Sequence, residues 1–187
     1  MIGPDQVRRS EPEAPLTEQQ QEASEDAVMT RIGQAVILLH AGDREEARNR
    51  LGEIWSEIGE AGDALHRCTL AHYLADAQDD PADELSWDLR ALAAAEALPG
   101  RAERRPHTAV RVFYPSLHLS LAADYVKLRR PEEARLHLAR ARAAAAALSD
   151  DGYGNGVRAA IARLERRLAA EPGPARPAPR PFPEQSP

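Results

Sequence analysis

One short segment of the sequence gathers residue types that could bind a metal ion or perform covalent chemistry. Cys68, His72 and Asp76 follow one another at intervals of four residues. In a helix this spacing places the three side chains along one stripe. A thiolate, an imidazole and a carboxylate are all ligands that zinc accepts in proteins. The same stripe could instead support nucleophilic catalysis by a Cys68 thiol that His72 activates.

Helix geometry limits both kinds of chemistry. Eight residues of helix rise about 12 Å, so one metal ion cannot touch both Cys68 and Asp76. A metal site would need further ligands, such as His40 or His118, and the sequence has no CxxC or HExxH spacing to support one. A thiol in the middle of a helix also lacks an oxyanion hole, because the nearby N–H groups are bonded within the helix. We therefore expect no catalytic residue, no metal and no cofactor.

The segments that carry these residues are predicted to be helices. Apolar residues recur at three- and four-residue intervals in seven segments between residues 17 and 170. Pro81, Pro115 and Pro131 each suit the first turn of a helix. Aromatic residues make up only 4% of the chain, so alanine and leucine must form the core, which favours closely packed helices. The predicted fold class is all-α.

The two ends of the chain have a different composition. Residues 1–16 lack apolar periodicity and are predicted to be a disordered arm. Residues 171–187 contain seven prolines and are predicted to be a proline-rich disordered tail. The folded domain is thus expected to span residues 17–170.

The predicted helices show an internal repeat. Three times a helix ends in a tight polar turn, and the next helix carries small or apolar residues at positions i, i+4 and i+7. These triplets are Ala47-Leu51-Ile54, Leu85-Leu89-Leu92 and Ala134-Leu138-Ala141.

These residues resemble the tetratricopeptide repeat. The clearest stretches are LLHAGDREEARNRL at 38–51 and LAADYVKLRRPEEARLHLARA at 121–141, which show the turn, the E-A or P-E-E-A opening and the alanine spacing of the family. The resemblance covers about residues 28–148. The repeats are degenerate and contain insertions, because their equivalent positions lie 38 and 49 residues apart rather than about 34.

The resemblance implies a stack of about three helix hairpins, with residues 157–169 as a capping helix. The first helix of each hairpin would line a concave groove. Such a protein is a non-catalytic scaffold or adaptor that binds a peptide or protein segment. The lysine and asparagine set with which some members hold a peptide carboxylate is missing here. By position, the groove residues would be Ile32, Val36, His40, Cys68, His72, Asp76, Leu119, Ala123 and Lys127.

The alternative function is a small-molecule- or metal-binding helical protein, possibly an enzyme. It would be centred on Cys68, His72 and Asp76, the three candidates for metal binding. Since no motif completes that site, we expect the chain not to be an enzyme.

The distribution of charge along the chain indicates which kinds of partner it could bind. Residues 1–98 hold 21 acidic and 8 basic side chains, whereas residues 99–187 hold 9 and 16. This asymmetry could support a head-to-tail homo-oligomer. A net charge of −6, few aromatic residues and no groove-reading motif argue against a nucleic-acid partner.

The location is predicted from what the sequence contains. It has no apolar run of about 18–20 residues, so we expect no membrane partner. The N-terminal residues lack the apolar region of a secretory signal. Cys68 is the only cysteine and cannot form an internal disulfide, which fits the cytoplasm. Many alanines and arginines, with one lysine, are typical of a GC-rich bacterial genome.

Overall fold

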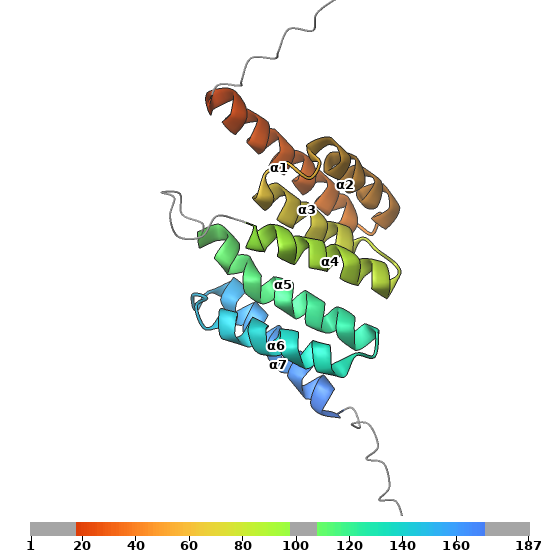
Figure 1. Cartoon of the computed structure of the whole chain (residues 1–187), viewed down its shortest axis with the longest axis vertical. Helices are drawn as coiled ribbons and strands as arrows, with labels where there is room; N and C mark the ends of the chain where they lie inside the picture. The colour runs from red at the N-terminus through yellow and green to blue at the C-terminus, as the bar shows by residue number, and fades with distance from the viewer. Residues whose placement is uncertain (1–17, 98–107, 171–187) are drawn as a thin grey trace, which may run out of the picture.

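The computed structural model describes residues 18–97 and 108–170, which form seven α-helices stacked in chain order (Figure 1). No strand occurs in these two ranges, so the prediction of an all-α stack is confirmed. The predicted arm, the proline-rich tail and residues 98–107 lie outside the described residues. No helix in the described ranges is both long enough and apolar enough to cross a lipid bilayer. The helices are α1 (Glu18–His40), α2 (Arg44–Ile58), α3 (Ala64–Asp76), α4 (Pro81–Glu96), α5 (Thr108–Lys127), α6 (Pro131–Ala145) and α7 (Gly152–Ala170).

Aspartates and prolines fix where several of the helices begin. The side chains of Asp43, Asp63 and Asp80 accept hydrogen bonds from backbone N–H groups in the first turns of α2, α3 and α4. These N-caps satisfy donors that have no partner within the helix. Pro81 and Pro131 stand in the first turns of α4 and α6, where a missing N–H group costs nothing.

The fifth helix begins earlier than the sequence predicts. Pro115 suits the first turn of a helix, but α5 already begins at Thr108 and Pro115 lies inside it. An interior proline costs a helix about 3 kcal/mol, so packing must offset that cost. Pro115 and Leu117 are fully buried, and the Tyr114 hydroxyl donates a hydrogen bond of 3.0 Å to the Ala95 carbonyl of α4.

The turn between α1 and α2 has the same backbone hydrogen bonds as the turn between α5 and α6. In the first turn the N–H of Asp43 donates to the carbonyl of Leu38 over 3.0 Å. In the second the N–H of Arg130 donates to the carbonyl of Tyr125 over 2.8 Å. Three further bonds match in the same way, donated by Ala41, Gly42 and Ala47 in one turn and by Leu128, Arg129 and Ala134 in the other.

The matched turns also share an unusual backbone conformation. Gly42 has a φ of 93° and its counterpart Arg129 has a φ of 57°. Positive φ suits glycine, and a residue with a side chain rarely adopts it. The arginine therefore keeps the turn geometry in spite of its side chain, which shows that the fold imposes this turn on both hairpins.

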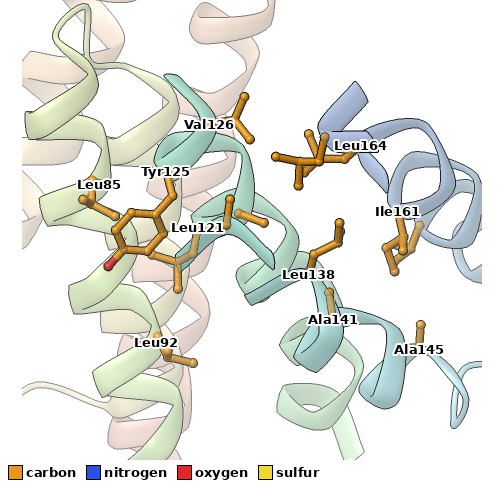
Figure 2. Close-up of a cluster of buried hydrophobic side chains, with 14 residues drawn as sticks. Leu85, Leu92, Leu121, Tyr125, Val126, Leu138, Ala141, Ala145, Ile161 and Leu164 are labelled. Atoms are coloured by element: carbon orange, nitrogen blue, oxygen red, sulfur yellow. The ribbon is translucent and has the colours of Figure 1, made fainter. Parts of the chain in front are cut away.

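The core consists of three clusters along the stack. An N-terminal cluster around Leu51 joins α1, α2 and α3, and a middle cluster around Ala91 joins α3, α4 and α5. A C-terminal cluster around Leu121 joins α4, α5, α6 and α7 (Figure 2). Each helix packs mainly on its neighbours in the chain, with additional contacts between α1 and α3 and between α5 and α7. The stack is thus held together by neighbour contacts, as in repeat proteins.

Candidate binding groove

The first helices of the three hairpins, α1, α3 and α5, together line an apolar pocket of about 420 Å³. Met29 and Phe113 are large apolar residues on its wall, and they are 38% and 40% exposed. Ile32 and Cys68 also line it and are almost completely buried. Exposed apolar side chains around a hollow of this size are typical of a surface that covers a partner's apolar side chains.

A second, polar pocket of about 580 Å³ lies where α1, α3 and α5 end. Its wall includes Asp76, the last residue of α3, and Lys127, the last residue of α5. Arg44 and Asp79 line it as an ion pair, with 3.4 Å between Nε and Oδ1. Glu84 lines it from α4 and binds Lys127 with both carboxylate oxygens.

Most of the nine residues that the sequence predicts for the groove line these two pockets. Four line the apolar pocket and three line the polar one. Leu119 and Ala123 instead pack against the C-terminal core cluster. The apolar pocket contains Ile32, Val36, Cys68 and His72, and the polar pocket contains His40, Asp76 and Lys127.

A network of buried carboxyl groups lies behind the groove, between α3, α4 and α5. Nδ1 of His72 is 3.1 Å from Oδ1 of Asp88, and Asp88 is 1% exposed. Asp124 is also 1% exposed and lies 3.5 Å from the Lys127 ammonium group. Since Lys127 binds Glu84 as well, the network links the last turn of α5 to α4.

Burial, together with the negative charges of Asp88 and Glu84, raises the pKa of Asp124 to about 8. A hydrogen bond between the side chains of Asp124 and Asp88 acts in the same direction, because two carboxyl groups can share one only when one of them is protonated. Oδ2 of Asp124 is buried and accepts no hydrogen bond from the described residues. At neutral pH, Asp124 is therefore a neutral acid that donates to the Asp88 carboxylate.

The same network sets the chemistry of His72 and Cys68. Burial lowers the pKa of His72, but the hydrogen bond to Asp88 and the negative charges of Asp88 and Asp76 outweigh it, so the net effect is a raised pKa. Burial, together with the negative charge of Asp88, raises the pKa of the Cys68 thiol to about 11. A thiol at neutral pH is neither a strong nucleophile nor a metal ligand, since both roles need the thiolate.

Two of the histidines suggested as metal ligands already contact other side chains. His72 bonds to Asp88, and His118 lies against His137 of α6, with 3.2 Å between the two Nδ1 atoms. Among the residues that the structure describes, no group of three or more histidine, cysteine, aspartate or glutamate side chains is placed to hold a metal ion.

The buried histidine pair predicts a loss of stability in acid. Burial, together with the positive charges of His118 and Arg140, lowers the pKa of His137 to about 4. In the unfolded chain His137 binds a proton near pH 6.5, whereas in the folded chain it stays neutral until about pH 4. His137 therefore destabilises the fold as the pH falls from about 6.5 towards 4. We expect His137→Gln to lose less stability than the wild type between pH 7 and pH 5, by up to about 1.4 kcal/mol per pH unit in urea unfolding.

A matched variant at an exposed histidine controls for that experiment. His40 is exposed, and His40→Gln should keep the pH dependence of the wild type. Parallel stability curves for His137→Gln and the wild type would contradict the assignment.

The helix α4 lies one residue out of the register that the sequence predicts. Counted from the N-cap residue Asp80, α4 places Glu84, Asp88 and Ala91 at the positions that Ala47, Leu51 and Ile54 occupy after Asp43 in α2. The middle residue of the predicted triplet Leu85-Leu89-Leu92 is therefore not on the buried face of α4, since Leu89 is 42% exposed. The central hairpin thus has carboxyl groups where the first hairpin has an alanine and a leucine.

The buried acids Asp88 and Asp124 were not singled out as site residues, although the sequence contains a signal for each. Asp88 lies three residues after Leu85 and four before Leu92, and both leucines are buried. Asp124 lies three residues after the buried Leu121. An acid at an apolar position of a helix indicates a buried polar group that needs a partner.

Comparison of the chain with protein-family models, with curated proteins and with solved structures finds no match. The function is therefore argued from the geometry of the groove and of the network behind it.

Proposed function

We propose that this chain is a tetratricopeptide-like repeat protein that binds a peptide or protein segment in its groove and performs no chemistry itself. The observation that carries the proposal is the apolar pocket that α1, α3 and α5 line together, with Met29 and Phe113 exposed on its wall. In a stack of hairpins the first helices form the concave surface, which is the usual binding surface of such proteins.

The matched turns support the repeat assignment. The backbone hydrogen bonds of the turn before α2 recur in the turn before α6, and each turn contains a residue with positive φ at the same position. The helices that follow place Ala47 and Ala134 at the same position after their turns, and both alanines are completely buried. The agreement thus extends from sequence spacing to backbone geometry, since both turns have the hydrogen bonds of a Schellman C-cap.

The states of Cys68 and His72 favour binding over catalysis. The protonated, buried thiol is a poor nucleophile, and His72 is held by Asp88 rather than by Cys68. The wall of the apolar pocket instead offers adaptable apolar contacts, such as Met29, whose burial by a partner would supply most of the affinity.

A random dodecapeptide library displayed on phage, panned against the full chain, tests this proposal. We expect selected peptides to bind the wild type and to bind Met29→Glu at least about tenfold more weakly, because the variant places a charge against the apolar side chain of the peptide. Fluorescence anisotropy with the synthetic peptides gives the affinities.

The control is another exposed apolar residue outside the groove. Leu136 on α6 is 52% exposed, and Leu136→Glu should bind the peptides as the wild type does. The proposal fails if no peptide is selected, or if the selected peptides bind Met29→Glu and the wild type equally well.

A further inference from the structure

We infer that the segment bound in the groove carries a lysine or arginine side chain that pairs with Asp76, beside an apolar side chain that fills the pocket at Cys68 and Met29. This inference rests on the proposed function and specifies the chemistry of its partner. The observations behind it are the continuity of the two pockets and the imbalance of charge in the polar one.

The two pockets follow one another along the same helices. On α3, Cys68 and His72 line the apolar pocket and Asp76 lines the polar pocket one turn later. On α1, Val36 lines the apolar pocket and His40 lines the polar one. A segment that lies along these helices would therefore meet apolar side chains first and charged ones next.

The cations of the polar pocket already have anionic partners. Arg44 pairs with Asp79, which also pairs with Arg48 over 3.1 Å. Lys127 pairs with Glu84 and lies 3.5 Å from Asp124. Because the cations that line the pocket already have ion-pair partners, an acidic segment would have to displace an existing contact in order to bind them.

The carboxyl groups outnumber their partners. Among the side chains that line the polar pocket, the carboxylates Asp76, Asp79 and Glu84 outnumber the cations Arg44 and Lys127. Asp76 is exposed and has no ion-pair or hydrogen-bond partner among the residues that the structure describes. Asp76 is therefore the carboxylate of this pocket that is left to bind a cation.

The geometry also limits the spacing of the two recognised side chains. Asp76 lies eight residues after Cys68, which is about 12 Å along the helix. An extended peptide covers that distance in about four residues. We therefore expect a bulky apolar residue and a basic residue about four positions apart in the bound segment.

The peptides selected from the random dodecapeptide library test this inference, together with synthetic versions in which the basic residue is changed to glutamine or to glutamate. We expect the glutamine version to bind the wild type about fivefold more weakly, and the glutamate version at least about tenfold more weakly. Added sodium chloride should weaken the binding of the basic peptide and leave the binding of the glutamine version almost unchanged.

Asp76→Asn locates the effect in the protein. This variant should bind the basic and glutamine peptides equally well, while its melting temperature stays at or above that of the wild type, because an unpaired charge among carboxylates has been removed. Glu60→Gln removes an exposed carboxylate that lines neither pocket, and it should retain the preference for the basic peptide. A fall in melting temperature together with weaker binding of every peptide would show a structural role for Asp76 and overturn the inference.

The remaining outcomes separate this inference from the proposed function. If the selected peptides depend on Met29 but contain no basic residue, or bind Asp76→Asn with the same preference, the groove binds peptides and the inference is wrong. If they are acidic, it is also wrong. If no peptide is selected, or if a second copy of the chain occupies the groove in native mass spectrometry, both proposals fail.

Discussion

Replacing Leu121 with alanine is expected to lower the free energy of unfolding by about 2–5 kcal/mol. Leu121 is completely buried and lies in the C-terminal cluster, where α4, α5, α6 and α7 meet (Figure 2). The shorter side chain leaves a cavity that four helices cannot close without losing other contacts. Urea unfolding followed by circular dichroism at 222 nm measures the change.

An exposed leucine provides the matched control. Leu136 on α6 is 52% exposed, and Leu136→Ala should change the free energy of unfolding by less than about 0.5 kcal/mol. Similar effects of the two substitutions would mean that Leu121 is not at the centre of the packing.

Asp124 should make the fold less stable as the pH rises through the neutral range. Its pKa of about 8 is above the usual 3.8, so between these values the folded chain keeps a proton that the unfolded chain releases. The stability contributed by this proton is complete in acid, falls by up to about 1.4 kcal/mol per pH unit, and is gone above about pH 8. His72, whose pKa is also raised, acts in the same direction.

Asp124→Asn isolates this effect, because the amide cannot ionise and still donates a hydrogen bond to Asp88. Urea unfolding at pH 6.5 and pH 8.5 should show the variant gaining up to about 2 kcal/mol relative to the wild type over that interval. Asp150→Asn, at an exposed residue that pairs with Arg158, should keep the pH dependence of the wild type. If the curves of Asp124→Asn and the wild type are parallel, Asp124 does not hold its proton in the folded state.

The sequence predicted the helices, and which residues share one side of a helix, because both depend on local periodicity. The four-residue spacing of Cys68, His72 and Asp76 places them on one side of α3 whatever the helix packs against. On α1, Ile32 and Val36 follow the same rule. These residues line pockets that α1, α3 and α5 share, because hairpins of this kind stack in only a few ways.

The buried network could not be predicted because it depends on contacts between helices. His72, Asp88 and Asp124 come from three different helices, and the sequence does not show which parts of these helices pack against one another. Asp88 also follows five other acids within 12 residues, a pattern that is typical of a solvated surface. The N-cap at Asp80 decides the register of α4, and a shift of one residue exchanges a leucine for a carboxyl group in the interior.

The positions of Glu84 and Asp88 affect how the molecule unfolds. In a linear array each layer is stabilised only by the layers beside it, so the junction with the least apolar contact separates first. Asp88 and Asp124 meet at the junction of α4 and α5, where loss of the Asp124 proton would bring two negative charges together. At a pH high enough to ionise Asp124, separation of the stack should therefore begin at this junction.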